Sequence, residues 1–251
     1  MDTVTLITGA SAGLGADFAR QCSARGERLV LVARRRNELE ALADELGNAR
    51  ALVMDLGEPG AAAAVTADVA ANGEKVGTLI NNAGFGLWGK FAALDGPRQR
   101  AMIDLNVGTL VELCHAVLPG MIERKSGAIL NIASTAAFQP GPGMAVYFAT
   151  KAFVLSFSEA LHEEVRDKGV RVTALCPGPT KTEFGAIAGF KGNGGFDKIS
   201  ARSEDVVAMG LKALDKGRAV AIPGLVNKAG AQAHRIVPRW LLRKVTAAIK
   251  Y

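Results

Sequence analysis

The 251-residue sequence has few cysteines and histidines, and what it lacks excludes several classes of protein. Its three cysteines, Cys22, Cys114 and Cys176, and its three histidines show neither disulfide-framework nor metal-ligand spacing. We therefore expect no zinc site, and buried, reduced thiols in a cytoplasmic protein. No apolar run approaches the ~20 residues of a membrane-spanning helix. We expect no signal peptide, because the first predicted strand follows Met1 and Asp2 at once.

Acidic residues are missing from the C-terminal end. The net charge is +6, and the segment from Lys216 to Tyr251 has eight Lys/Arg residues and no Asp or Glu. Composition is otherwise ordinary, with 49% hydrophobic and 22% charged residues, so we expect no extensive disorder. The cationic segment could meet an acidic partner, a membrane surface or nucleic acid. Without nucleic-acid recognition motifs, we favour a solvated surface over nucleic-acid binding.

The basic C-terminal extension, residues 228–251, has the pattern of a short amphipathic helix. Val237-Pro238 can start it, because proline suits the first turn. One face would carry Leu241, Val245, Ala248 and Ile249, and the opposite face Arg239, Arg243 and Lys250. The helix could lie on an anionic membrane, with Trp240 and Tyr251 at the interface. We favour packing of the apolar face on the domain or on a second subunit.

Short apolar runs alternate with helical stretches along the whole chain. Strands are expected at 3–8, 28–33, 50–54, 77–81, 127–133, 170–176 and 218–222. Helices are expected at 14–25, 36–46, 59–72, 98–123, 145–167 and 203–215. Alternation of this kind predicts an α/β fold, a doubly wound parallel sheet with helices on both faces. No linker divides residues 1–251, so we expect a single Rossmann-like domain.

A glycine-rich turn joins the first predicted strand to the first helix. It consists of Gly9, Ala10, Ser11, Ala12, Gly13, Leu14 and Gly15. A strand, a glycine turn and a helix form the context in which a dinucleotide pyrophosphate binds at a helix N-terminus. Such turns also serve as plain connections, but the second apolar run at 28–33 favours the dinucleotide interpretation.

Tyr147 and Lys151 lie four residues apart in a predicted helix, so both side chains leave the same face. A phenol loses its proton near pH ~10, and an ammonium held close by lowers that pKa. The pair is a candidate general acid/base near neutral pH. Tyr-x-x-x-Lys alone is common by chance, and an ordinary helix face would show it too.

Six motifs follow one another in a characteristic order. They are Thr8-Gly9-x-x-x-Gly13-x-Gly15, Asn81-Asn82-Ala83-Gly84, Asn106, Ser134, Tyr147-x-x-x-Lys151 and Pro177-Gly178. Together they resemble the short-chain dehydrogenase/reductase family, from residue 3 to roughly residue 182. The resemblance implies hydride transfer between a nicotinamide and a carbonyl or secondary alcohol.

The same resemblance assigns a catalytic set, which consists of Asn106, Ser134, Tyr147 and Lys151. Ser134 and Tyr147 would donate hydrogen bonds to the substrate oxygen, and Tyr147 would also donate its proton. Lys151 would lower the tyrosine pKa and bind the nicotinamide ribose, and Asn106 would hold a water that links the lysine to solvent. Without the resemblance, Ser134 is also compatible with a strand-end turn, and Asn106 with an exposed helix face.

The end of the second predicted strand is expected to choose between NAD and NADP. A carboxylate there binds the ribose hydroxyls of NAD. This chain instead has Ala33 followed by Arg34, Arg35 and Arg36. Arginine suits a phosphate, so we predict NADP(H). By its position in the family pattern, Arg34 would be the main contact, with Ser11 as a helper. Arg35 and Arg36 are expected only to begin an exposed helix.

Three further segments would line the cofactor by resemblance. Asp55, with Leu56 beside it, would accept a hydrogen bond from the adenine, although Asp55-Leu56-Gly57-Glu58 also has the form of a helix capping box. The other contacts would come from Asn82, Ala83, Gly84, Pro177, Gly178, Thr180 and Thr182, the last four near the nicotinamide.

Residues 183–202 contain five glycines between Glu183 and Phe196 and follow a strand's carboxyl end. We interpret them as a substrate lid, with a disordered insertion as the alternative. The segment Ala221–Lys228 departs from the family's common Val-Asp-Gly-Gly-like sequence, which puts a tetramer interface in doubt. We expect a homo-oligomer, dimer or tetramer, with a small carbonyl or alcohol as substrate. A non-catalytic NADP-binding regulator and a membrane-surface reductase of a lipid carbonyl are the rival interpretations.

Overall fold

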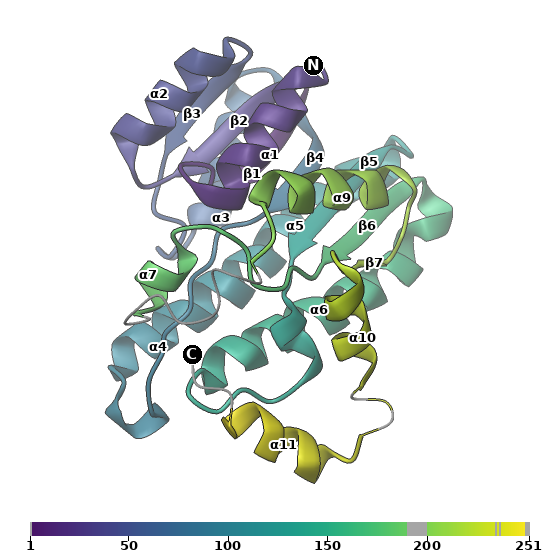
Figure 1. The fold of residues 1–251 in the computed structure, drawn as a ribbon. Coiled ribbons are helices and arrows are strands. Elements are labelled where there is room, and N and C mark those ends of the chain that lie inside the picture. The colour runs from purple at the N-terminus through teal and green to yellow at the C-terminus, as the bar shows by residue number, and fades with distance from the viewer. Residues whose placement is uncertain (1, 190–199, 234, 236, 249–251) are drawn as a thin grey trace.

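One seven-stranded parallel sheet forms the centre of the protein (Figure 1). The computed structural model describes residues 2–189, 200–233, 235 and 237–248. The strand order is β3-β2-β1-β4-β5-β6-β7, so the crossover from β3 to β4 reverses the direction in which the sheet grows. The strands are β1 (Asp2–Thr8), β2 (Arg28–Ala33), β3 (Ala49–Val53), β4 (Glu74–Asn81), β5 (Gly127–Ile132), β6 (Val170–Leu175) and β7 (Val220–Ala221).

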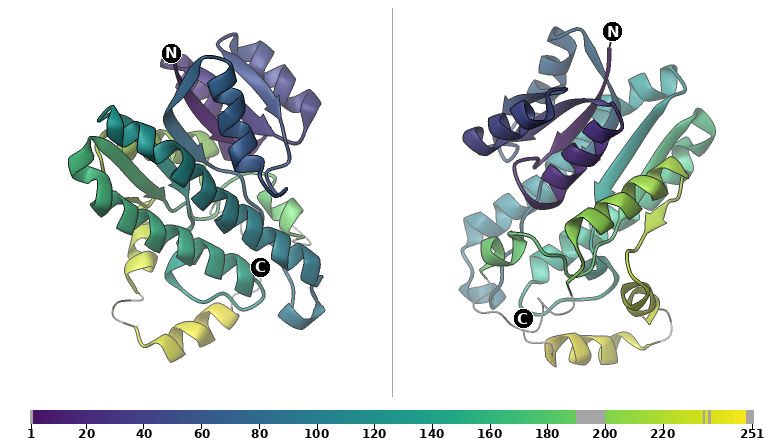
Figure 2. Two further views of the ribbon diagram at one scale, coloured as in Figure 1. Left: turned by 180° about the vertical axis from the view of Figure 1, so that it is seen from behind. Right: turned by 45° about the horizontal axis from the view of Figure 1, so that its top comes forward.

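Helices cover both faces of this sheet (Figure 2). On one face lie α1 (Gly13–Ala24), α2 (Arg36–Leu46) and α9 (Ser203–Asp215), and on the other α3 (Ala61–Ala71), α5 (Leu110–Glu123) and α6 (Ala145–Val165). Toward the carboxyl edge and the C-terminus, the described residues also form the α-helices α4 (Gly96–Ile103), α7 (Phe184–Ala188), α10 (Leu225–Ala233) and α11 (Arg239–Ala248). The predicted doubly wound α/β fold is confirmed.

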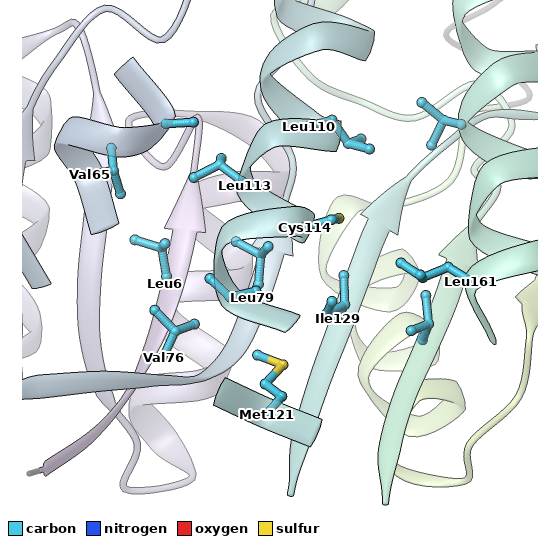
Figure 3. Packing of buried hydrophobic residues seen from close by; sticks show 14 of the residues in the cluster. Leu6, Val65, Val76, Leu79, Leu110, Leu113, Cys114, Met121, Ile129 and Leu161 are labelled. Carbon is cyan, nitrogen blue, oxygen red and sulfur yellow. The ribbon is translucent and has the colours of Figure 1, made fainter. Parts of the chain in front are cut away.

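Each face of the sheet has its own hydrophobic core. Parallel strands that are buried on both faces need continuous apolar runs, as in Leu29–Ala33. Figure 3 shows the core on one face, where Leu79 and Ile129 of the strands meet Leu113 and Met121 of α5. Phe18 of α1, which is fully buried, belongs to the core on the other face. The two cores fix the positions of the strands, so the carboxyl ends of the strands form a rigid edge of the sheet.

A buried polar chain crosses the first of these cores. Asn81 of β4 donates to Asn131 Oδ1 of β5 at 2.9 Å. Asn131 Nδ2 donates in turn to Ser158 Oγ of α6 at 2.9 Å. Each of the three residues is at most 4% exposed. Because buried amides are costly without partners, this chain fixes how α6 sits on the sheet.

The helix expected at 98–123 is interrupted. Residues Asp104–Thr109 form a π-helical turn between α4 and α5, and Asn106 lies within it. A π-turn inserts an extra residue and often occurs at functional sites. The whole stretch Gly96–Glu123 is long and apolar enough, by length and composition, to cross a membrane, contrary to our expectation. Within it, Leu110, Leu113, Val117 and Met121 of α5 are buried in the core against the sheet.

The C-terminal helices differ from the expectation. α10 was not predicted, and α11 begins after Pro238 as expected but faces the protein with Leu242 and Thr246. Leu241 and Val245, which were expected to pack, are 38% and 51% exposed in this single chain. Ile249 and Lys250 lie outside the described residues. Packing of that face on the domain is therefore wrong for Leu241 and Val245, and the other favoured alternative, packing on a second subunit, stays a prediction.

The polar chain gives a stability prediction. Replacing Asn131 with Ala removes the oxygen that accepts from Asn81 and the amide that donates to Ser158, so the free energy of unfolding should fall by about 1–3 kcal/mol. Asn37 on α2 is exposed, and Asn37→Ala should change it by less than about 0.5 kcal/mol. Urea titrations of both variants measure these values, and equal small losses would contradict the structural role of Asn131.

Candidate active site

The glycine-rich turn between β1 and α1 tolerates no larger residue at its central positions. Gly9 and Gly13 have φ angles of 65° and 53°, which side-chain-bearing residues rarely adopt. A Cβ atom at Gly15 would lie 2.1 Å from the Gly9 carbonyl oxygen. The turn is therefore closed on itself, and its backbone amides at the N-terminus of α1 are available to an anion.

The end of β4 is clamped to this turn. Thr8 Oγ1 accepts hydrogen bonds from the backbone amides of Asn82 and Ala83, both at 3.0 Å. Asn82 Nδ2 donates to the carbonyls of Thr8 and Gly9, at 3.0 and 3.1 Å. The Asn82 side chain thus orients the turn, and Thr8, which we had not assigned to the site, orients the strand end.

Lys151 of α6 is buried directly below the edge of the sheet. Its side chain is 6% exposed, and Nζ donates to the carbonyl of Ile132 at 2.7 Å. Burial lowers the pKa of its ammonium to about 8. Burial also raises the pKa of the nearby Cys176 thiol to about 12, so no thiolate is present near neutral pH to offset this effect. The lysine carries its charge up to mildly alkaline pH.

Tyr147 lies one turn before Lys151 on α6, as expected from their spacing. Lys151 Nζ is 5.8 Å from the centre of the Tyr147 ring. Gly84 closes the site from above, since a Cβ there would lie 2.8 Å from Asn106 Oδ1 and 3.7 Å from Lys151 Nζ. Tyrosine, lysine and asparagine therefore meet beneath the loop that follows β4.

Asn106 ties that loop to α6. Its amide donates to the Phe85 carbonyl at 2.9 Å and to Thr150 Oγ1 at 3.2 Å, and its oxygen accepts from the Phe85 amide at 3.0 Å. The residue is 1% exposed, so the exposed-face alternative is wrong. The π-helical turn directs this amide inward, where it forms hydrogen bonds with both the loop after β4 and α6.

Ser134 follows β5 and faces the loop after β6. Its hydroxyl accepts from the Ala136 amide at 3.1 Å and donates to the Pro177 carbonyl at 3.4 Å. In the same loop, Thr182 is the residue that a Cβ at Gly13 would contact, at 3.2 Å. The loop that carries Pro177, Gly178, Thr180 and Thr182 therefore lies between the serine and the glycine-rich turn. Asn227 of α10, a residue that sequence reasoning missed, lies against Gly178.

Two guanidinium groups flank the glycine-rich turn. Arg34 Nη1 lies 3.4 Å from Asp55 Oδ2, and Arg35 Nε donates to Ser11 Oγ at 3.1 Å. Arg35 is exposed, as expected for a helix start, but its hydrogen bond to Ser11 places it beside the turn, which sequence reasoning missed. Arg36 pairs with Glu40 within α2, as an exposed helix start would.

Asp55 is not a helix cap. Its Oδ1 accepts from the Gly57 amide at 2.9 Å, and α3 begins only at Ala61, after Gly60. The capping-box interpretation is therefore wrong, and Asp55 stays at the edge of the sheet as an acceptor. The Leu56 side chain is 4% exposed and belongs to the core, so only the backbone of Leu56 can contact a ligand.

The expected lid is described only in part. Its first residues form α7, a short helix that begins at Phe184, where a loop was expected. Residues 190–199, which make up half of the predicted lid, lie outside the described residues. Phe184 was not predicted as a site residue, yet its ring centre lies 5.2 Å from that of Tyr147.

These groups fit a dinucleotide that carries an additional phosphate. The backbone amides at the N-terminus of α1 can bind a pyrophosphate, and Arg34, Arg35 and Ser11 can bind a phosphate beside it. Among the described residues, no group of three or more His, Cys, Asp and Glu side chains could hold a metal ion. The arrangement suits proton transfer at Tyr147 next to a bound redox cofactor.

The sequence model of the short chain dehydrogenase family matches residues 3–188, which is more than half of the sequence. The chain belongs to the short-chain dehydrogenase family. It is 40% identical to Sulfoacetaldehyde reductase 2 of Chromohalobacter salexigens over 189 residues, 73% of this chain and 75% of that protein. It is 39% identical to the NADP-dependent 3-hydroxy acid dehydrogenase YdfG of Escherichia coli K12, over 82% and 83% of the two chains.

A solved structure supports the same assignment. The short-chain dehydrogenase from Sphingobium yanoikuyae in complex with NADPH matches this dehydrogenase with a TM-score of 0.84 and 34% identity. The match covers all of this chain and 97% of that one. The likeness therefore includes the C-terminal region, beyond the part matched by the family model.

The arginine pair gives a binding prediction. Arg34→Ala should weaken NADPH binding by about 1.5–3 kcal/mol, because it removes a charge-assisted phosphate contact. This loss corresponds to an increase in Kd of about 10- to 150-fold. NADH lacks that phosphate and should bind almost unchanged. Arg36→Ala is the matched control, because Arg36 pairs with Glu40 instead. Fluorescence titration with both cofactors measures the effect, and equal losses for NADPH and NADH would make Arg34 structural.

Proposed function

We propose that this enzyme is an NADP(H)-dependent reductase of carbonyl compounds and dehydrogenase of the matching secondary alcohols. The observation that carries the proposal is the buried Lys151 beside Tyr147, beneath a glycine-rich dinucleotide turn with two arginines. The NADP-dependent relative and the NADPH complex described above support the choice of cofactor.

The bound dinucleotide supplies or accepts the hydride. In the reduction, negative charge develops on the carbonyl oxygen, and the chain must stabilise it and supply a proton. We assign the proton donor to the Tyr147 hydroxyl and a second hydrogen bond to the Ser134 hydroxyl. In the oxidation the same groups act in reverse, with Tyr147 as the base.

Lys151 supports this proton transfer electrostatically. A cation near the ring stabilises the tyrosinate that remains after proton donation. Its hydrogen bond to the Ile132 carbonyl holds the ammonium in place, and the closure by Gly84 and Asn106 keeps it from bulk water. We assign Asn106 the task of holding the loop after β4 in the position that the site needs.

The first prediction concerns the proton donor. Tyr147→Phe keeps the ring and its packing but removes the hydroxyl, so kcat should fall by about 10²–10⁴-fold. Binding of NADPH should be largely retained. Steady-state assays over a panel of carbonyls, with NADPH titration as the control, check both parts. A variant with more than about a tenth of the wild-type rate would show that another group donates the proton.

The second prediction concerns pH. Lys151 is charged below its pKa of about 8 and loses the charge as pH rises through that value. The kcat/KM for carbonyl reduction should therefore decline above pH about 8 in the free enzyme. In Lys151→Arg the guanidinium stays charged throughout this pH range, so the decline should disappear even if the rate is lower. If the same decline remains in Lys151→Arg, a different group titrates.

A further inference from the structure

A third apolar cluster lies outside the two sheet cores and surrounds the catalytic tyrosine. We call it the Tyr147 cluster. Its buried members are Leu87, Met102, Ala136, Met144, Tyr147, Phe148 and Ala188, and its half-buried members are Phe85, Trp88, Leu94, Val146 and Phe184. The members come from the loop after β4, from α4, from the 3₁₀ turn Thr135–Phe138 after β5, from the start of α6 and from α7. All views place α7 beside α4 (Figures 1 and 2).

Phe184 is the member nearest to the reacting group. The centres of its ring and of the Tyr147 ring are 5.2 Å apart, at an interplanar angle of 47°. A Cβ at Gly86 would lie 2.8 Å from Phe184 Cζ, 2.9 Å from Met144 Cε and 3.3 Å from Tyr147 Cδ2. Phenylalanine, methionine and tyrosine thus converge on one glycine, so a substrate at the Tyr147 hydroxyl contacts this wall.

Backbone hydrogen bonds hold the wall together. The Trp88 amide donates to the Ala188 carbonyl at 2.9 Å, and the Gly89 amide donates to the Gly143 carbonyl at 2.9 Å. A Cβ at Gly143 would lie 2.6 Å from the Trp88 ring, so that ring covers the loop before α6. The position of α7, and with it of Phe184, is therefore tied to both neighbouring loops.

Charge is absent from this wall. Tyr147 is the only ionisable member of the Tyr147 cluster. The described charged residues within two positions of a member are exposed, apart from the half-buried Asp104; they are Lys90, Asp95, Arg100, Asp104 and Glu183. The buried cation beside the cluster is Lys151, which donates to the Ile132 carbonyl. Glu183 pairs with Arg35, away from the cluster. A carboxylate or sulfonate placed against the wall would lose hydration without gaining a cation. An apolar group there would instead gain contacts with aromatic rings and a methionine.

We infer that the substrate of this enzyme is a carbonyl compound with a bulky apolar substituent, and that Phe184 is its specificity-determining contact. The inference rests on the proposed function and adds the substrate class to it. The inferred substrate differs from the compounds in the names of two relatives, sulfoacetaldehyde and 3-hydroxy acids. Those compounds carry a sulfonate or a carboxylate, which needs a cation that the described wall does not provide.

Three methyl ketones test the substrate class, because they share the same reacting carbonyl group and differ only in the other substituent. They are cyclohexyl methyl ketone, butanone and acetoacetate, each assayed with NADPH. The cyclohexyl compound should exceed butanone in kcat/KM by about tenfold or more, since its additional carbons meet an apolar pocket. Acetoacetate should be the poorest of the three. If acetoacetate is the best, the inference is wrong, while the proposed function stands.

Phe184→Ala tests the residue. It should lower kcat/KM for cyclohexyl methyl ketone by about tenfold and change butanone by less than about twofold, because butanone is too small to lose much contact. NADPH affinity should stay within about twofold, as Phe184 belongs to the apolar wall rather than to the phosphate site. Phe153→Ala is the matched control: Phe153 lies on α6, is 44% exposed and stacks on Phe157. Equal losses for both ketones would make Phe184 merely structural.

A binding measurement keeps the inference testable where turnover is slow. The chain has two tryptophans, Trp88 in the wall and Trp240 on α11. In Trp240→Phe, the remaining fluorescence reports on Trp88 alone. Saturable changes with cyclohexyl methyl ketone, and none with acetoacetate at equal concentration, support the inference. Saturation by acetoacetate at lower concentration overturns it. Absence of reduction of all three ketones, together with such apolar binding, counts against the proposed function and not against the substrate class.

Discussion

The burial of one lysine constrains everything around it. An ammonium taken from water needs a partner, and Lys151 finds it in the Ile132 carbonyl at the end of β5. That carbonyl is free because β5 ends there, and α6 can bring the lysine to it because Asn131 and Ser158 hold α6 against the strand. The loop after β4 then has to pass so close that position 84 admits only a glycine. Sheet, helix and loop are thus positioned by the solvation of a single charge.

Much of the fold could be predicted because it depends on short-range patterns. Apolar runs on strands buried on both faces and the spacing of Leu39 and Leu42 in α2 indicate their elements without any tertiary information. The π-helical turn at 104–109 could not be predicted, because the contacts that favour it, from Asn106 to Phe85 and Thr150, join residues that are distant in the sequence. The direction that α11 faces is a tertiary property as well. Its sequence offers an apolar face with Leu241 and Val245, but the protein packs against Leu242 and Thr246.

The residues of the site likewise divide into those that the sequence predicts and those that only the structure shows. Tyr147, Lys151 and the glycine-rich turn carry their spacing in the sequence, and a single helical turn or a positive φ angle is enough to place them. Arg35 and Phe184 carry no such signal. The position of each in the site could not be predicted, because it depends on a contact with a residue distant in the sequence. Arg35 contacts Ser11, and Phe184 contacts Tyr147. Asp55 shows the opposite case, since its capping-box pattern is present but the helix begins later.

The separation of the three apolar clusters has a consequence for how such enzymes diversify. The side chains of the Tyr147 cluster belong to neither sheet core, and apart from the tyrosine none of them is assigned a part in proton transfer. Mutations at Trp88, Met144 or Phe184 can therefore accumulate while the sheet keeps its stability and the lysine keeps its partner. A lineage built on this scaffold can exchange one substrate for another by small steps, each of which leaves a folded, cofactor-competent intermediate for selection to act on.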